Sequence, residues 1–273
     1  MISYPAGAGS TLTRVLEAGS GSEVVLFLHG VGARADRWRN NLSTIAAAGY
    51  RCIALDLPGH GFAQKGPDFP YGVPGYADFI ESFLDDQRIA SADFVGTSLG
   101  AHIAATVACR RPALARSLTL VGATGLFPLG AEACSNIANR IVDRERPGIE
   151  RKLKVVMYDD SGITDDMIEE EWAINNSPGS NEAFAKLADY FRNQIDSDAV
   201  GERLAALDAP IPKLLVWGGQ DRSVPLAIGH KAQELLKKVP LRIIPETAHA
   251  PYVENPQAFN DILVKFLKTR SAI

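Results

Sequence analysis

Short apolar runs alternate with segments of helical length along most of this chain, and this rhythm limits the folds open to it. Six runs are expected to form strands: residues 24–28, 52–55, 94–95, 118–121, 214–217 and 241–244. Several are continuously apolar, as is typical of strands that helices cover on both faces. Helical patterns lie at about residues 37–48, 75–88, 99–110, 227–238 and 257–268. We therefore predict an α/β fold with a mostly parallel, eight-stranded sheet, in which residues 2–5 and 11–17 add an antiparallel edge.

The alternation of strands and helices stops between about residues 126 and 206, where helical patterns continue but no convincing buried strand occurs. The run Thr164–Trp172 has the pattern of a capped helix with acids in its first turn. A second helix is expected at about residues 181–193, with Ser180 or Asn181 as its N-cap. Insertions of this kind at the carboxyl edge of a sheet usually form lids. The expected parts are a core of residues 1–125 and 207–273 and a helical cap of residues 126–206.

The segment Gly96-Thr97-Ser98-Leu99-Gly100 lies directly between an apolar run and a run of small residues. A G-x-S-x-G sequence between a strand and a helix predicts a sharp, strained turn that raises the serine hydroxyl above the sheet. Gly96 and Gly100 lack side chains because the turn brings backbones too close together. The helix N-terminus offers the Leu99 N–H, and its dipole, to an oxyanion. Ser98 is therefore the candidate nucleophile.

A serine hydroxyl is a poor nucleophile until a neighbouring base removes its proton. The chain has five histidines, and the sequence around four of them suggests another place or role. His29 opens a glycine loop, His60 lies in a tight turn, His102 lies on the helix after the serine, and His230 lies on a surface helix. Only His249 lies on a loop after the last strand with nothing else to explain it. We expect His249 to be the general base.

The base needs a carboxylate that fixes its tautomer and stabilises the imidazolium. Asp221 follows a buried run through two glycines, which places it at the same sheet edge as Ser98 and His249. Asp208 precedes its strand and so lies at the other edge. Asp56 begins a tight turn, and a structural role explains it better. Asp221 is therefore the predicted orienting acid.

An oxyanion needs a second N–H donor in addition to the one at the helix N-terminus. The loop after the run 24–28 is glycine-rich enough to aim a backbone N–H inward, and Val31 is the preferred donor, with Gly32 as the alternative. His29 is expected to brace this loop rather than to react. Arg34 and Arg37 follow closely; we interpret them as solvated surface, and binding of a substrate carboxylate is the less favoured alternative.

Together these residues resemble the α/β-hydrolase superfamily over essentially the whole chain. The shared features are the His29-Gly30 loop, the turn Asp56–Gly61, the G-x-S-x-G segment, Asp221 with Val224-Pro225, and His249. The order serine, aspartate, histidine is also that of the α/β-hydrolases. A finer resemblance is to the meta-cleavage-product C–C hydrolases, which cut vinylogous 1,5-diketones from aromatic catabolism. It rests on residues 157–168 and 254–260.

Three positions differ from the pattern of those C–C hydrolases. Thr97 stands where the family usually has asparagine, and Ala250 stands where it has tryptophan. Glu171 precedes Trp172, where the family usually has an arginine that grips the dienoate carboxylate. The resemblance implies substrate contacts at Gly32, Thr97, Trp172 and Ala250. It also implies that a dianionic dienoate would meet the acids of residues 159–171 in place of a guanidinium.

The sequence leaves the reaction open among several classes. The leading prediction is a serine hydrolase that cleaves a small ester, lactone or amide through an acyl-enzyme on Ser98. C–C bond hydrolysis of meta-cleavage products is the alternative. A cofactor-free lyase, dioxygenase or perhydrolase on the same fold is a second alternative. A ligand receptor is disfavoured because the three candidate catalytic residues are all present.

The composition limits the classes of partner that this chain is expected to bind. The net charge is −4 and no basic stripe occurs, which disfavours nucleic acid. No apolar run approaches 18 residues and the N-terminus lacks the pattern of a signal peptide, so we expect a cytoplasmic protein that does not bind a membrane. The three cysteines are scattered without metal-ligand spacing. No cluster of histidines and carboxylates has ligand spacing either, so we expect neither a metal nor an organic cofactor. The expected partner is a small-molecule substrate. The oligomeric state is open, with a homodimer as one arrangement.

Overall fold

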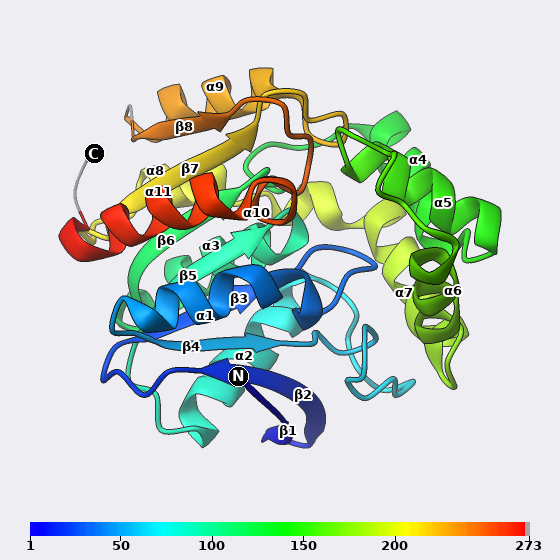
Figure 1. Cartoon of the computed structure of the whole chain (residues 1–273), viewed down its shortest axis with the longest axis horizontal. Helices are drawn as coiled ribbons and strands as arrows, with labels where there is room; N and C mark the ends of the chain where they lie inside the picture. The colour runs from blue at the N-terminus through cyan, green and yellow to red at the C-terminus, as the bar shows by residue number, and fades with distance from the viewer. Residues whose placement is uncertain (238, 271–273) are drawn as a thin grey trace.

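The computed structural model describes residues 1–237 and 239–270, and its centre is an eight-stranded sheet in the order β1-β2-β4-β3-β5-β6-β7-β8 (Figure 1). The strands are β1 (Ile2–Ala8), β2 (Thr11–Ala18), β3 (Val24–Leu28), β4 (Arg51–Leu55), β5 (Ala92–Thr97), β6 (Ala115–Val121), β7 (Lys213–Gly218) and β8 (Leu241–Ile244). The strand β2 pairs antiparallel with both β1 and β4, and the other neighbours are parallel. The predicted fold class is therefore confirmed, including the antiparallel edge.

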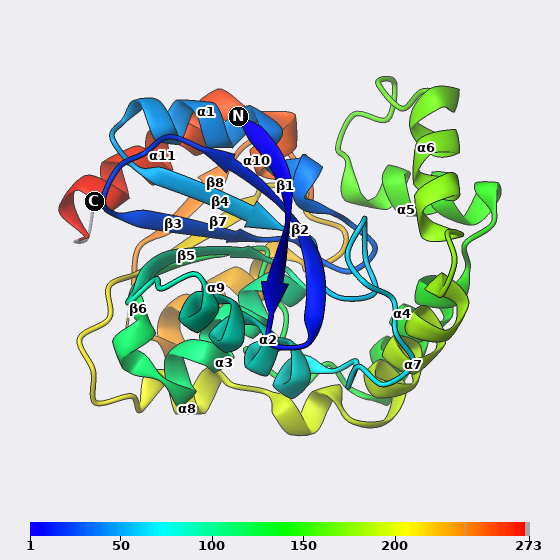
Figure 2. The same ribbon diagram turned by 90° about the horizontal axis from the view of Figure 1, so that it is seen from below.

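Helices cover both faces of the sheet, as Figure 2 shows from below. One face carries α1 (Arg39–Ala47), α10 (Pro251–Glu254) and α11 (Pro256–Thr269), and the other carries α2 (Val73–Asp86), α3 (Leu99–Arg110), α8 (Gly201–Ala205) and α9 (Leu226–Leu235). Alternate residues of one strand therefore enter different cores. Leu26 and Leu28 pack in the core with α2 and α3, whereas Val25 and Phe27 pack in the core with α1 and α11. Double coverage explains why the central runs are continuously apolar.

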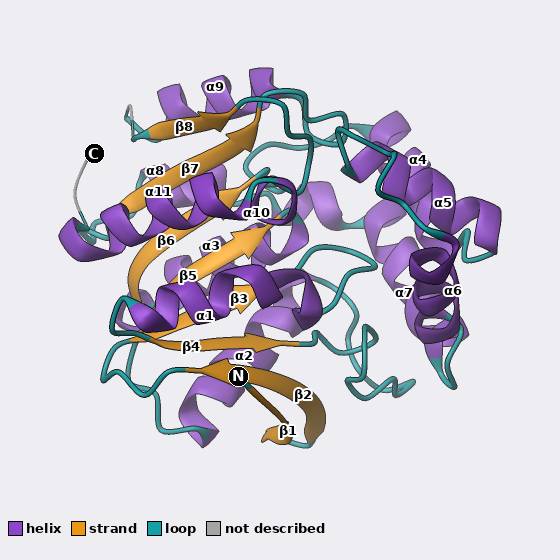
Figure 3. Ribbon diagram, viewed as in Figure 1, coloured by secondary structure: helices purple, strands orange, loops and turns teal. Residues whose placement is uncertain are grey.

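A group of helices lies beyond the carboxyl ends of the parallel strands, away from both covering layers (Figure 3). It consists of α4 (Ala131–Val142), α5 (Arg146–Val156), α6 (Asp165–Asn175) and α7 (Ser180–Asn193). These helices fall within the segment predicted as a cap. Among the described residues, no helix is both long and apolar enough to cross a membrane.

The two helix starts predicted in this segment have different outcomes. Thr164 caps α6, because its hydroxyl oxygen accepts a hydrogen bond of 3.2 Å from the Met167 N–H. The N-cap predicted for α7 is wrong: Gly179 holds that position with φ +84°, and Ser180 is already the first helical residue. Glycine is required there, because a Cβ would lie 2.5 Å from the carbonyl oxygen of Lys65.

Candidate active site

Ser98 lies in the sharp turn between β5 and α3, with φ +52° and ψ −118°. Positive φ is costly for a residue with a side chain, so the surrounding contacts must hold this conformation. Its N–H donates to the Val121 carbonyl oxygen at 3.0 Å. A Cβ on Gly96 would lie 2.4 Å from the Gly100 carbonyl oxygen, and a Cβ on Gly100 would lie 2.3 Å from that of Leu28. Close packing of the main chain therefore helps to set the position of the serine.

His249 and Asp221 are joined by a hydrogen bond from Nδ1 to Oδ2 of 2.8 Å. The other carboxylate oxygen, Oδ1, accepts from the N–H groups of Ser223 and Val224, both at 2.8 Å. Three donors thus fix this carboxylate in one orientation. Gly122 lies against the pair, since a Cβ there would be 3.0 Å from His249 Nδ1. The arrangement leaves Nε2 of His249 as the ring nitrogen available to act as a base.

Three of the remaining histidines are buried and one is exposed. His29 donates from Nδ1 to the Gly30 carbonyl oxygen at 2.8 Å and accepts at Nε2 from the Leu57 N–H at 2.9 Å, so it braces the loop as expected. Burial lowers the pKa of His29 and of His102, and it lowers that of His60 to about 3. His230 is exposed on α9. These groups are neutral or distant from Ser98, and His249 remains the candidate base.

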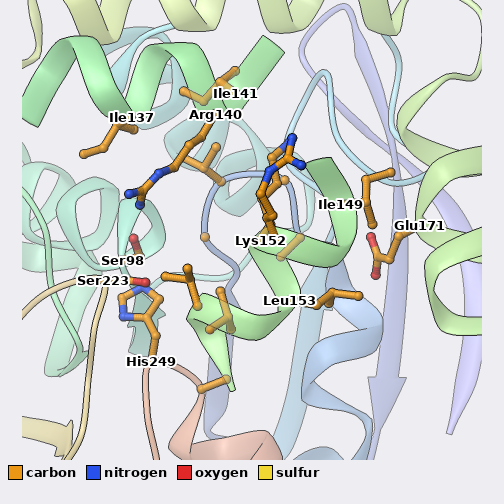
Figure 4. Close-up of a pocket in the computed structure, with 18 of the residues that line it drawn as sticks. Ser98, Ile137, Arg140, Ile141, Ile149, Lys152, Leu153, Glu171, Ser223 and His249 are labelled. Atoms are coloured by element: carbon orange, nitrogen blue, oxygen red, sulfur yellow. The ribbon is translucent and has the colours of Figure 1, made fainter. Parts of the chain in front are cut away.

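A cavity of about 550 Å³ lies between the sheet edge and the helices α4 to α7, and both Ser98 and His249 line it (Figure 4). Of the predicted substrate contacts, Gly32, Thr97 and Ala250 also line it. Trp172 does not; its ring lies 3.7 Å from the Arg146 guanidinium, which covers it. Trp172 is therefore turned away from the cavity.

The two predicted oxyanion donors come from the loop after β3 and from the start of α3. Val31 lines the cavity, and Leu99 begins α3 directly after the serine. Within the described part of the chain, neither N–H donates to another protein group. The loop that carries Val31 passes close to the serine, because a Cβ on Gly30 would lie 3.1 Å from Ser98 Cβ. The local geometry thus permits both N–H groups to bind an oxyanion, and their role stays a prediction.

Glu171 does not present an unpaired charge to the cavity. Its Oε1 accepts from Arg34 Nη1 at 2.5 Å and from Arg37 Nη2 at 2.9 Å. The side chains of Arg34 and Glu171 are only 8% and 7% exposed, so the expectation of a solvated Arg34 was wrong. The other acids of residues 159–171 are exposed and do not line the cavity. A dianionic substrate would therefore not meet the acidic surface that the sequence implied.

Replacing Glu171 with glutamine is expected to lower the free energy of unfolding by about 2–3 kcal/mol, because a charged hydrogen-bond acceptor between two arginines is lost. The matched control is Glu170→Gln, since Glu170 also pairs with Arg34, at 2.8 Å, but its side chain is 62% exposed. An exposed pair contributes about 0–1 kcal/mol. Urea unfolding of both variants measures the difference, and equal shifts in the two would contradict a buried link between α6 and the core.

Basic residues on α4 and α5 are the part of the cavity that the sequence analysis missed. Arg140 of α4 and Lys152 of α5 line it together with apolar neighbours such as Ile137, Ile141 and Ile149. Ile137, Arg140 and Ile141 occur at the spacing of one helical face. A basic residue embedded in such an apolar stripe was the available signal, but spacing alone did not show what the stripe faces.

One protein family and several known proteins match most of this chain. The model of the alpha/beta hydrolase family matches residues 25–262. The chain is 30% identical to 2-hydroxy-6-oxo-6-(2'-aminophenyl)hexa-2,4-dienoic acid hydrolase of Metapseudomonas resinovorans, over 97% of this chain and 91% of that protein. It is 32% identical to the dihydrolipoyllysine-residue acetyltransferase component of the acetoin cleaving system of Cupriavidus necator, over 93% of this chain but only 66% of that longer protein.

Among solved structures, the meta-cleavage product hydrolase CumD from Pseudomonas fluorescens IP01 superposes with a TM-score of 0.87. The two sequences are 24% identical, and the match covers 98% of each chain. At this identity the match shows the same fold. It extends over the helices α4 to α7 as well as the sheet, because almost no part of either chain is left out.

Proposed function

Because the chain belongs to the alpha/beta hydrolase family, we propose that it is a serine hydrolase that cleaves the carbon–carbon bond beside a ketone in a 2-hydroxy-6-oxodienoate. The observation that carries this proposal is the cavity that Ser98 and His249 line together, with His249 hydrogen-bonded to Asp221. The named reaction of the Metapseudomonas resinovorans relative supports the substrate class. The pairing of Glu171 with two arginines also removes the charge reversal that counted against an acidic substrate.

The proposed reaction begins with a proton shift in the substrate. His249 Nε2 accepts the proton of the 2-hydroxyl and delivers it to C5, which gives the keto tautomer and leaves His249 neutral again. Ser98 Oγ then attacks the C6 carbonyl while His249 takes the hydroxyl proton. The N–H groups of Val31 and Leu99 hold the oxyanion. The C5–C6 bond breaks and its electron pair delocalises onto the 2-oxo oxygen. That oxygen takes the proton from His249, the 2-hydroxydienoate leaves, and the acyl group stays on Ser98.

Water completes the cycle. His249 takes a proton from a water molecule that attacks the acyl-enzyme, and the proton passes to Ser98 as the acid product leaves. We propose that residues 126–206 act as the lid of this cavity, because α4, α5, α6 and α7 supply its outer wall. Asp221 holds the Nδ1–H tautomer of His249 throughout, so that Nε2 can accept each proton.

Hydrolysis of an ester, lactone or amide is the second candidate. It needs the same nucleophile, base and oxyanion donors and differs only in the leaving group. Thr97 and Ala250 line the cavity where the C–C hydrolases usually have asparagine and tryptophan, and these differences favour a different substrate. The relatives' named reactions put C–C cleavage first.

The test is a parallel assay of the wild-type enzyme on a 2-hydroxy-6-oxodienoate chromophore and on a short-chain aryl ester. We expect the dienoate absorbance to disappear with the release of two products, an acid and a 2-hydroxydienoate, and with a kcat/KM well above that for the ester. Ester turnover with the dienoate untouched would make the second candidate the function. Enzyme prepared identically with Ser98→Ala serves as the control for contaminating hydrolases.

A further inference from the structure

Six basic side chains line the cavity, and four of them already have protein partners. Arg37 pairs with Glu171, Arg144 donates to Asn175 and Asn181, Arg151 pairs with Asp143, and Lys154 pairs with Glu150. The other two are Arg140 and Lys152. In the described part of the chain, neither makes a hydrogen bond or an ion pair. The cavity thus holds two cations that no carboxylate of the described residues contacts directly.

These two cations enter the cavity from the cap. Figure 4 shows Arg140 extending from α4 toward the region of Ser98 and His249, with Lys152 on α5 between Arg140 and Glu171. Arg140 is exposed at the rim, whereas Lys152 is partly buried. A partly buried ammonium without a partner costs free energy, so an anion that enters beside it is favoured. The catalytic groups stand on the opposite wall, on the core.

We propose that Lys152, with Arg140 at the rim, binds a carboxylate of the substrate while the scissile carbonyl lies at Ser98. The inference rests on the proposed function and names the group that selects its substrate. An anion held at the cap by a lysine and a carbonyl held at the sheet edge by two N–H groups define the two ends of the bound molecule. A substrate without the carboxylate would lack one of these two anchors.

The protonation of Lys152 gives the binding a defined pH dependence. Burial lowers the pKa of its ammonium to about 8, opposed by the carboxylates of Asp143 and Glu171 and reinforced by Arg144 and Arg151. Below this value the ammonium is charged and attracts a carboxylate. Affinity for the carboxylate therefore holds at neutral pH and falls as the pH rises above about 8, while a neutral ligand of the same shape lacks this dependence.

The kinetic test compares Lys152→Met, Lys152→Arg and the control Lys186→Met on a dienoate carboxylate and on its methyl ester. A hydrogen bond to a charged group changes affinity by about 10- to 100-fold, so Lys152→Met should raise KM for the carboxylate by that factor and reduce the preference for it over the ester. Lys152→Arg should restore most of the preference, because it keeps the charge. Lys186 is also a cap lysine, on α7, but it does not line the cavity and it pairs with Glu182, so its variant should keep the wild-type preference.

A binding test separates this inference from the proposed function. The probes are 4-phenylbutyrate and its uncharged amide, titrated by calorimetry into Ser98→Ala and into the same protein with Lys152→Met. We expect the carboxylate to bind more tightly than the amide, and the difference to vanish in the double variant. Equal binding of the two probes before Lys152 is changed would overturn the inference. Carboxylate binding that depends on Lys152, in an enzyme inert to dienoates, would support the site and refute the proposed substrate.

Discussion

Replacing Ser98 with alanine lowers kcat by about 10⁴-fold or more on any substrate that the enzyme turns over, because the nucleophile of the proposed acyl transfer is lost. The fold is expected to be retained, since alanine keeps the Cβ that the turn between β5 and α3 already accommodates. Steady-state kinetics measure the loss. A fluorophosphonate probe gives a second readout: it should add its mass to one residue of the wild type and to none in the variant.

Ser223→Ala is the matched control for this change. Ser223 also lines the cavity, and Figure 4 shows it beside His249, yet its side chain has no role in the proposed reaction. We expect this variant to retain most of the activity and to react with the probe. If Ser98→Ala kept activity within tenfold of the wild type, the acyl-enzyme mechanism would be refuted, whatever the substrate.

Replacing Asp221 with asparagine is expected to lower kcat by about 10⁴-fold with little effect on KM, following the behaviour of such triads. Asparagine can still accept from the N–H groups of Ser223 and Val224 through its oxygen. Its NH₂ group would then face His249 Nδ1 and force that nitrogen to accept. The proton would move to Nε2, and the base could no longer take the proton of the serine.

Asp208→Asn is the matched control, since Asp208 is exposed and precedes β7 at the other edge of the sheet. Its activity should match that of the wild type. Stopped-flow kinetics on a chromogenic substrate would place the loss in Asp221→Asn on the chemical step rather than on binding. A loss that appeared in KM alone would mean that Asp221 shapes the cavity and does not orient the base.

The strands and the candidate catalytic residues could be predicted from sequence because their signals are local. A buried strand, two glycines and an aspartate are read from consecutive residues, and the elbow around Ser98 is defined by a five-residue pattern. Parallel strands then bring their carboxyl ends to one edge, which is why residues as distant as Ser98 and His249 were expected together. The structure places both in one cavity.

The walls of the cavity could not be predicted in the same way. Glu171 meets Arg34 across 137 residues of sequence, and no local pattern reports such a contact. Trp172 was expected in the cavity because it follows a position that resembles a substrate contact. Successive residues of a helix point about 100° apart, so Trp172 leaves the face that Glu171 occupies. The orientation of a cap helix depends on the residues that it packs against. Only the tertiary structure shows which residues those are.

The contacts of Gly96 and Gly100 have a consequence for laboratory evolution of this enzyme. The close contacts around the serine turn are with backbone atoms of β3, α3 and the loop after β3, so they do not involve cap side chains. Arg140 and Lys152 lie at the proposed far end of a bound ligand. They are on α4 and α5, which belong to the inserted cap and not to the layers that cover the sheet. Val156 at the end of α5 accepts from the His249 N–H at 2.9 Å, so libraries on α4 and α5 that leave Val156 unchanged would explore new substrates with the reactive groups kept in place.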